Sequence, residues 1–410
     1  MPIPPSLREM ALATDALRGG GVAEPFGPVA AAFSRLVGRG AGGGALVVRL
    51  GGTTVVNLCT GAADRRGRRR WTPDTLAISF STTKGVASTV VHRLVDRGEL
   101  GYDDRVAAHW PEFGVGGKER VTVRELLTHR AGLHSVQAVA RRAEDLLDHV
   151  AMENHLAARS VRAPTTRSAY HAITYGWLVS GLVRRVTGRG LGELVHTELA
   201  VPLGTDGLHI GAPADIRGRV AEPIGSALRH LGSTAQVLAP IWTRMGSARA
   251  AYEALHLSGF HRLFEGIEPP IWTTEMPAVN GTFSADGLAR LYGALANGGT
   301  DAGATLLSPE TTHALGRVQL RNADADADAV LGLRMRWRLG YHQAFGAGPS
   351  SPQAFGHYGY GGSGGWADPT LGLSLGFVTN RIGSVSTPLG DLTLFRLNRV
   401  VRECAARATA

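Results

Sequence analysis

The order of apolar and polar positions predicts strands near both ends of the chain and helices between them. Residues 27–39 repeat apolar side chains at helical spacing. Two β-rich runs then flank the pair Gly51 and Gly52, which is a strong signal for a hairpin. A helical period begins after Ser81 and ends at Gly98, a residue type that commonly terminates helices.

The middle of the chain is mostly helical in pattern, and its connections are rich in Gly and Pro. Helices are predicted within 121–133, 174–188 and 284–299, each with an end signal such as Ser at the start or Gly after the last turn. Residues 235–275 are instead apolar and aromatic. They are expected either to cover a pocket or to belong to the ordinary core. The aromatic residues are Trp242, Phe260, Phe264 and Trp272.

Strand character returns at 331–343 and 371–380, and a C-terminal helix follows. Strands at both ends predict one sheet built from both ends of the chain, with the helical middle as an insertion, which is an α+β arrangement. We expect an α/β domain of residues 1–100 and 305–410, and a mostly helical domain of residues 101–304.

The positive charge of the chain comes almost entirely from arginine. The 43 Lys and Arg residues against 34 Asp and Glu give a net charge of +9, yet only Lys84 and Lys118 are lysines. Apart from the run at 64–70, the arginines are scattered and no nucleic-acid motif accompanies them, so no nucleic-acid partner is expected. Arginine stays protonated, whereas a buried lysine can lose its proton, so Lys84 is either a candidate base or a plain surface lysine.

Other chemistries find little support in the sequence. Cys59 and Cys404 have no metal-site spacing and no disulfide framework, and no His pair with an adjacent acid indicates zinc. Residues 322–330 resemble the start of a calcium loop but lack its turn glycine and bidentate Glu, so we interpret them as a solvated loop. The acidic residues of this loop are Asp324, Asp326 and Asp328. No apolar run reaches the length of a signal peptide or a membrane span, so a cytoplasmic protein is expected.

Two serines compete as the nucleophile, and the first is Ser363. It lies in "GGSGG", which matches the Gly-x-Ser-x-Gly motif of α/β-hydrolases. That motif requires a following helix and a later histidine. A turn and a strand are predicted after Ser363, and no histidine occurs after His357. The pattern therefore argues against Ser363.

The second candidate is Ser81, which lies one helical turn before Lys84 in "ISFSTTKGVAS" and faces the same side. A serine hydroxyl needs a base, and a lysine that exchanges protons with a nearby phenol can supply one. Tyr170, just before a helix, is the first candidate phenol, and Tyr175 is its competitor. Backbone N–H groups at the helix start and in the glycine-rich stretch 356–365 can form an oxyanion hole.

Three short segments together resemble a known family. Ser81-Thr-Thr-Lys84, Tyr170-His171-Ala172 and His357-Tyr358-Gly359 are similar, in this order, to the three motifs of the β-lactamase-like serine hydrolases. That group includes class C β-lactamases, D,D-peptidases, family VIII carboxylesterases and fungal acyltransferases, and the likeness extends from about residue 25 to 400. It implies the β-lactamase/penicillin-binding-protein-like fold, in which N- and C-terminal helices flank an antiparallel sheet.

The resemblance also implies roles for individual residues. Ser81 would be the acylated nucleophile, Lys84 would help to activate it, and Tyr170 would act as base or proton shuttle. The oxyanion N–H groups would come from Ser81 and Tyr360. The residues in contact with substrate would be His357, Gly359 and His171.

Two departures from the family pattern narrow the substrate. Ala172 lacks the side-chain amide that β-lactamases have there, and His357 replaces a permanently charged lysine. Both favour neutral acyl esters, so we expect a serine esterase for small to medium carboxylic esters that needs no cofactor and works through acyl-Ser81. The alternatives are a β-lactamase or D,D-peptidase, an acyltransferase with the same acyl-enzyme, and a non-catalytic relative.

Overall fold

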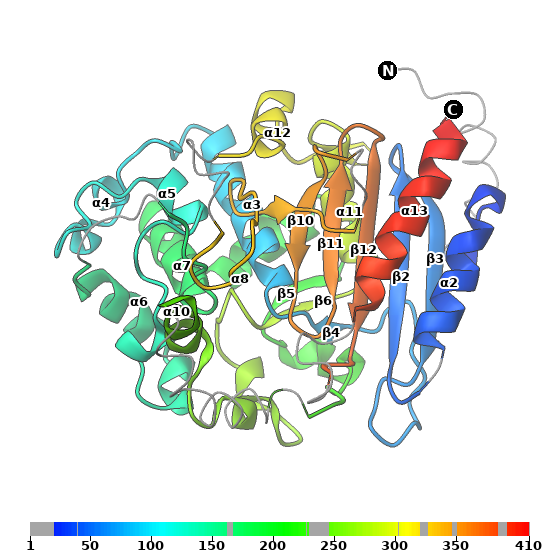
Figure 1. Ribbon diagram of the computed structural model, residues 1–410, viewed down its shortest axis with the longest axis horizontal. Coiled ribbons are helices and arrows are strands. Elements are labelled where there is room, and N and C mark those ends of the chain that lie inside the picture. Colours follow the sequence, from blue (N-terminus) through cyan, green and yellow to red (C-terminus); the bar gives the residue numbers. More distant parts are fainter. Residues whose placement is uncertain are drawn as a thin grey trace.

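The computed structural model describes residues 20–38, 40–161, 167–226, 228, 246–301, 303–319, 327–346, 351–383 and 392–409. Its centre is a seven-stranded antiparallel sheet in the order β1-β3-β2-β12-β11-β10-β9 (Figure 1). The strands are β1 (Gly21–Val22), β2 (Gly43–Leu50), β3 (Thr53–Gly61), β9 (His342–Gln343), β10 (Phe355–Tyr358), β11 (Gly364–Asp368) and β12 (Leu373–Thr379).

Strands from the N-terminal and C-terminal parts of the chain are neighbours in this sheet, as the sequence predicted. β2 pairs with β12 from Leu50 opposite Leu373 to Gly44 opposite Thr379. The predicted hairpin joins β2 to β3 through Gly51 and Gly52, whose φ angles of 56° and 80° suit the tight turn that glycine favours.

Helices cover both faces of the sheet. α2 (Gly27–Val37) and α13 (Thr393–Thr409) pack together over one face, on which the Leu46 side chain of β2 is buried. α3 (Thr82–Asp96) and α11 (Ala285–Ala296) lie against the other face, where the neighbouring Val47 side chain is buried. Because successive side chains of a strand point to opposite faces, a strand covered on both faces is apolar almost throughout.

Most of the remaining helices lie beside the sheet, to the left in Figure 1. The helices are α4 (Val106–His109), α5 (Val123–Leu127), α6 (His149–Ala158), α7 (Thr174–Thr187), α8 (Leu191–Leu194), α10 (Gly246–Leu255) and α12 (Pro309–Leu315). The 3-10 turns include η8 (Phe260–Phe264) and η9 (Pro270–Trp272). The small strands are β4 (Ala77–Ile78), β5 (Leu208–Ile210), β6 (Gly281–Phe283), β7 (Thr300–Asp301) and β8 (Ala304–Thr305).

The predicted helices are confirmed, with their end signals. Ser284 caps α11 by accepting a hydrogen bond from Gly287 N–H at 3.0 Å, and Gly188 ends α7 with a φ of 72°. α11 lies within the range expected for the helical domain, yet it packs on the sheet through β2, β11 and β12. The expected domain boundaries themselves stay a prediction.

The predicted strand at 331–343 is wrong except for its last two residues, which form β9. Positive φ angles at Gly332, Arg336 and Gly340 bend this segment repeatedly. The interpretation of 322–330 as a solvated loop is also wrong where the structure describes it, because Asp328 is buried. Trp242 and residues 320–326 lie outside the described residues.

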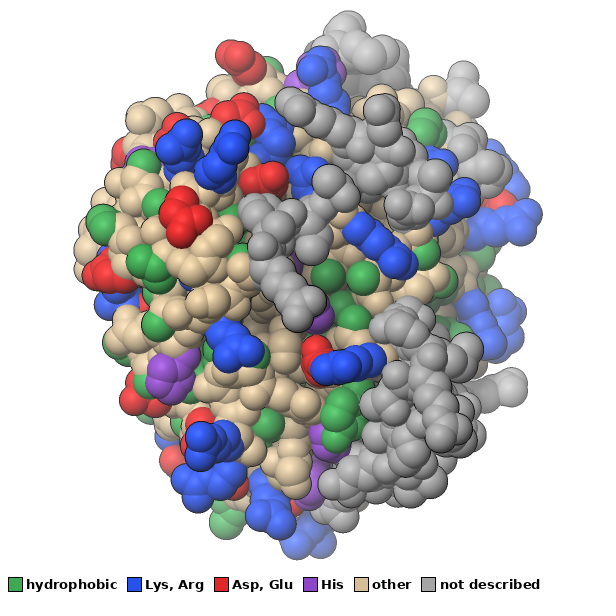
Figure 2. Space-filling model, turned by 60° about the vertical axis from the view of Figure 1, so that its left-hand side comes forward, with side chains coloured by type: hydrophobic (Ala, Val, Ile, Leu, Met, Phe, Trp, Pro, Cys, Tyr) green, Lys and Arg blue, Asp and Glu red, His purple; other side chains and the backbone are tan. Residues whose placement is uncertain are grey.

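On the face shown in Figure 2, the Lys and Arg side chains of the described residues are interspersed with acidic and uncharged ones. Within the described part of the chain, no helix is both long enough and apolar enough to cross a membrane.

Candidate active site

A short strand and a sharp turn place Ser81 at the start of α3. β4 pairs with β6, and the Ser79 N–H donates to Gly281 O at 2.8 Å. The chain then turns at Phe80, which has a φ of 46°. Such a backbone costs about 1–3 kcal/mol for a residue with a side chain and is concentrated at functional sites. Ser81 is half-buried, while nearly all of α3 behind it is buried.

Lys84 lies one turn further along α3, with no exposed surface. Its Nζ is 2.9 Å from Ser81 Oγ. It also donates to two backbone carbonyls, Ala172 O at 2.7 Å and Ala278 O at 3.1 Å. Burial lowers the Lys84 pKa well below its usual value, because the charged ammonium loses water there.

The two carbonyls orient the amine toward Ser81. A carbonyl can only accept, so the carbonyls of Ala172 and Ala278 take two N–H groups of Lys84 in either protonation state. The remaining position on Nζ faces Ser81 Oγ. In the neutral amine this position is a lone pair, which can accept the serine proton.

Tyr170 comes from the segment before α7 and reaches the same serine. Its phenol is hydrogen-bonded to Ser81, and Lys84 Nζ lies 4.9 Å from the centre of its ring. A contact between this hydroxyl and Lys84, expected from the sequence, stays a prediction. Burial, opposed by that hydrogen bond, raises the Tyr170 pKa above its usual value, so the phenol stays protonated near neutral pH.

The competing tyrosine, Tyr175, points elsewhere. Its hydroxyl lies 2.7 Å from Ser88 Oγ, on the next turn of α3 beyond Lys84, and the side chain is completely buried.

The end of β10 lies against the turn that carries Ser81. A Cβ on Gly359 would lie 2.0 Å from Ser79 O, so only glycine permits this approach. The Gly359 N–H is already used, since it donates to Ser363 O at 2.7 Å. Among the backbone hydrogen bonds of the described residues, neither the Ser81 N–H nor the Tyr360 N–H has a carbonyl acceptor. Both groups fit the expected oxyanion hole.

The two histidines of the second and third motifs are buried and neutral. Burial lowers the pKa of His357 far below its usual value, and it lowers that of His171 to about 3. The His357 ring stacks 6.3 Å from the Tyr170 ring, and its Nε2 has no partner among the described residues. His171 Nε2 accepts from the Leu133 N–H at 3.1 Å, which ties it to the loop after α5.

Ser363 lies in a structural position, as expected from its sequence context. The strand β11 begins directly after it, without the turn predicted there, and occupies the place where the Gly-x-Ser-x-Gly motif requires a helix. Its Oγ accepts from the Thr379 N–H at 3.1 Å, and its carbonyl accepts from Thr82 Oγ1 at 3.0 Å. The residue therefore joins neighbouring strands to the start of α3.

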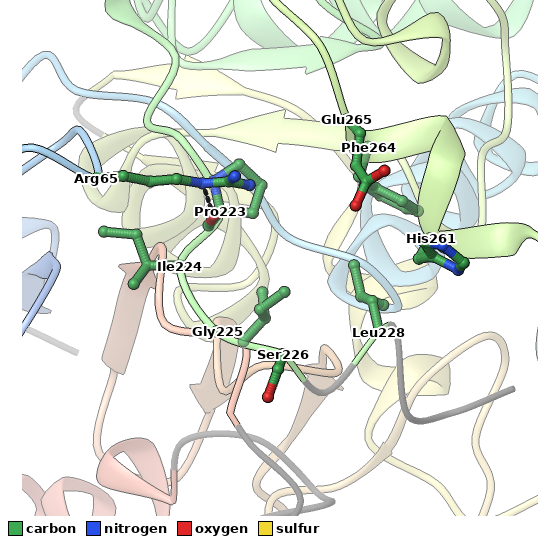
Figure 3. Close-up of a pocket in the computed structure, with 10 residues that line it drawn as sticks. Arg65, Pro223, Ile224, Gly225, Ser226, Leu228, His261, Phe264 and Glu265 are labelled. Carbon is green, nitrogen blue, oxygen red and sulfur yellow. Dashed lines mark hydrogen bonds between the residues drawn. The ribbon is translucent and has the colours of Figure 1, made fainter. Parts of the chain in front are cut away.

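A cavity of about 300 Å³ (Figure 3) has a wall residue in contact with the turn before Ser81, and its lining residues do not include Ser81, Lys84, Tyr170 or His357. Its Phe264 side chain packs against Phe80, with 5.5 Å between ring centres, and Phe80 directly precedes Ser81. Figure 3 shows Arg65 and Glu265 on opposite sides of the cavity. Its apolar lining residues include Ile224, Leu228, Phe264 and Ile382. Phe264 belongs to the segment expected either to cover a pocket or to lie in the core; it lines this cavity and is also buried in the core together with Phe260.

Sequence reasoning missed Asp328, which accepts a hydrogen bond from the Tyr170 N–H at 3.1 Å. A carboxylate isolated between alanines gave no signal of burial. Near this site and elsewhere in the described part of the chain, no group of three or more His, Cys, Asp or Glu residues could hold a metal ion.

Comparisons with known proteins agree with this arrangement. A family model described as β-lactamase matches residues 29–394. The chain is 40% identical over 392 residues to the esterase/β-lactamase LipL of Mycobacterium tuberculosis, covering 95% of this chain and 89% of that protein.

Two solved structures are similar along nearly the whole chain. One is a family VIII carboxylesterase, with a TM-score of 0.79, 34% identity and coverage of 94% of this chain and 99% of the other. The second is a penicillin-binding protein homologue from Caulobacter crescentus, with a TM-score of 0.77, 32% identity and the same two coverages, 94% and 99%.

Replacing Lys84 by Arg should damage ester hydrolysis nearly as much as replacing it by Ala. Arginine keeps the positive charge but has no neutral form, so it cannot accept the serine proton. We expect kcat for p-nitrophenyl butyrate to fall about 10²–10⁴-fold in both variants. Lys118→Arg is the control, because this other buried lysine has different partners: its Nζ donates to the carbonyls of Val115 and Arg159 and lies 5.2 Å from the centre of the Phe113 ring. Near-normal turnover of Lys84→Arg would show that charge alone is required.

Tyr170→Phe should lose far more activity than Tyr175→Phe, although both remove one buried hydroxyl. The first change removes the phenol that contacts Ser81 and should lower kcat about 10²-fold or more. The second removes a bond to Ser88 and should cost about 1 kcal/mol of stability with kcat nearly unchanged. Steady-state kinetics and thermal unfolding measure the two effects, and equal losses of kcat would contradict the assignment.

Proposed function

The chain belongs to the β-lactamase family, and from that premise we propose that it is a serine esterase that hydrolyses small to medium neutral carboxylic esters through an acyl-Ser81 intermediate. The observation that supports this most directly is the buried Lys84 amine, held by two carbonyls with Nζ 2.9 Å from Ser81 Oγ. Two similar proteins are named as an esterase and as a carboxylesterase, which is the kind of activity proposed for this chain.

In the acylation step, Ser81 Oγ attacks the ester carbonyl carbon while its proton passes to the neutral Lys84 amine. The carbonyl oxygen becomes an oxyanion that the Ser81 and Tyr360 N–H groups can stabilise. When the tetrahedral intermediate collapses, the bond to the alcohol oxygen breaks, and Tyr170 gives its phenolic proton to that oxygen. Tyr170 then recovers a proton from Lys84, so that in the net balance Ser81 has lost one proton and the released alcohol has gained one.

In the deacylation step, water takes the place of the alcohol. Its proton passes through Tyr170 to Lys84 while its oxygen attacks the acyl carbon. The second tetrahedral intermediate releases the acid, and Ser81 Oγ regains a proton from the same pair. An acceptor alcohol that entered here would give acyl transfer through the same acyl-enzyme.

The electrostatics of the site favour uncharged substrates. Burial holds the His357 pKa far below its usual value, so the third motif offers no positive charge near neutral pH. Ala172 contributes only a backbone carbonyl, which Lys84 occupies. The cavity of about 300 Å³ near Phe80 combines apolar lining residues with Arg65, His261 and Glu265, and it is within the size range of small-ligand pockets.

β-Lactam hydrolysis is the second candidate function, because the name of the 40% identical relative includes both activities. The acyl-enzyme chemistry is the same. The substrate, however, presents a carboxylate and an acylamino group that need polar partners, and the residues at 172 and 357 do not supply the usual ones.

Labelling and mutation of the nucleophile test the proposed function. Intact-mass analysis after incubation with a fluorophosphonate should show one adduct on the wild-type protein and none on Ser81→Ala. The Ser81→Ala variant should lose several orders of magnitude in hydrolysis of p-nitrophenyl esters. Ser363→Ala is the matched control and should keep both the label and most activity. A folded, inactive Ser363→Ala beside an active Ser81→Ala would overturn the assignment.

Ester hydrolysis should exceed β-lactam hydrolysis by about a hundredfold or more in kcat/KM. Two polar groups left without partners would each cost about 1–3 kcal/mol, and every 1.36 kcal/mol is about a factor of ten in rate. Nitrocefin and p-nitrophenyl butyrate should be compared on one preparation. Equal kcat/KM values would replace the esterase reading by a β-lactamase one.

A further inference from the structure

Asp328 is a buried carboxylate whose hydrogen bonds converge on the segment that carries Tyr170. The residue is 1% exposed. Its Oδ1 accepts from the N–H groups of Tyr170 at 3.1 Å, Val330 at 2.9 Å and Leu331 at 3.1 Å. Its Oδ2 accepts from the indole N–H of Trp337 at 3.2 Å. Four N–H donors therefore take the place of water around this carboxyl group.

These bonds hold Tyr170 by its backbone and by its ring. Tyr170 precedes α7, so no helical hydrogen bond fixes its N–H group. Next to the Asp328 bond, the Ala329 N–H donates to Ser168 O at 2.9 Å, which fastens the same two segments a second time. The phenol ring of Tyr170 stacks on Trp337 with 5.5 Å between centres and 11° between planes. Asp328 thus anchors both the main chain of Tyr170 and the indole on which its ring rests.

The charge of Asp328 also acts on the phenol. Burial is the first cause that raises the Tyr170 pKa, and the negative charge of Asp328 raises it further, against the hydrogen bond from Ser81. For Lys84, burial is the cause of the lowered pKa. In the described part of the chain, no Lys or Arg forms an ion pair with Asp328 that would neutralise this charge.

The other titratable groups around Tyr170 keep one protonation state near neutral pH. Burial lowers the pKa values of the neighbouring imidazoles and raises that of the neighbouring phenol. These groups are His129 after α5, His171 before α7, Tyr175 in α7 and His357 in β10. A change of charge at residue 328 therefore acts on Tyr170, and it also acts on His134, whose pKa burial lowers and the charge of Asp328 raises.

We propose that Asp328 is a positioning residue for the esterase reaction: it clamps Tyr170 over Ser81 and keeps the phenol protonated, so that Tyr170 donates a proton to the leaving alcohol while Lys84 accepts one from Ser81. This role rests on the proposed function. In this role Tyr170 donates a proton and Lys84 accepts one, although both contact Ser81. Asp328, which does not touch the substrate, maintains this difference between them.

Asp328→Asn is the central test, because the carboxamide keeps the size and one acceptor oxygen but removes the charge. The amide oxygen can still accept the three backbone N–H groups, and the amide NH₂ then faces the indole N–H of Trp337, donor against donor. We expect kcat to fall roughly 10–100-fold with KM little changed, since a small misplacement of a reacting group has effects of this size. The acid limb of the kcat–pH profile should move to lower pH, because a lost negative charge lowers the pKa of either Tyr170 or Lys84.

Two further variants separate positioning from stability. Asp368 is equally buried and also accepts from a backbone N–H two residues on, that of Thr370 at 3.0 Å, but it pairs with Arg402. Asp368→Asn should lower the melting temperature without moving the pH profile. Trp337→Phe keeps a ring beneath Tyr170 and removes the indole N–H. Combined with Asp328→Asn, it should restore part of kcat and leave the pH shift in place, a coupling that a double-mutant cycle measures.

Each outcome decides the proposal. A folded Asp328→Asn enzyme with the kcat and pH profile of the wild type, or with only the loss of stability seen for Asp368→Asn, overturns it. If Asp328→Asn does not fold, Trp337→Phe alone decides, because a lower kcat at unchanged KM supports the clamp and an unchanged kcat overturns it. Fluorophosphonate labelling of wild-type Ser81 is read separately. Absence of a label refutes the esterase itself, whereas a labelled wild type beside an unaltered Asp328→Asn refutes only this role.

Discussion

The burial of one lysine amine between two backbone carbonyls is the constraint on which the rest of the site depends. Lys84 reaches Ala172 O from the segment before α7 and Ala278 O from the segment before β6, so three parts of the chain must meet around a single nitrogen. Removing an ammonium from water is costly, and the amine responds by a lowered pKa. The carbonyls leave one direction free, toward Ser81 Oγ, and that direction makes the group a base.

Few of the groups around Lys84 and Ser81 change their charge near neutral pH. Buried imidazoles from several elements face Tyr170 and Lys84, and burial keeps the pKa of each far below its usual range. These neutral rings pack against their neighbours and orient them, and they add no net charge to the site that binds the ester. A substrate carboxylate, in contrast, would lose water and find no cation at His357.

The strained turn at Phe80 connects the nucleophile to its pocket. The chain leaves the strand β4 at this turn, and the Phe80 ring packs against the rings of Tyr360 and Phe264, with centres 5.8 Å and 5.5 Å away. The turn thereby contacts both a residue of the candidate oxyanion hole and a residue of the cavity wall. Packing of the Phe80 ring against these two rings and the hydrogen bond that Ser79 makes to β6 help to offset the conformational cost at Phe80.

Local sequence determined the elements whose signals are local. The Gly51-Gly52 turn, the capped helices and the one-turn spacing of Ser81 and Lys84 follow from backbone geometry and side-chain period alone, and each was predicted. The order of the three motifs likewise indicated the family before any contact was known.

Tertiary structure decided the rest. The alternation at 331–343 predicted a strand, but its Trp337 is bound to Asp328 and stacked on Tyr170, so the segment bends to follow those contacts. The residues around Asp328 are typical of a solvated loop. Its burial and its hydrogen bond with Tyr170, 158 positions away, cannot be recognised from the neighbouring sequence. The phenol of Tyr170 meets Ser81 while that of Tyr175 meets Ser88 for the same reason: which face of α3 each tyrosine reaches depends on how α7 packs on it, and packing is a property of the whole chain.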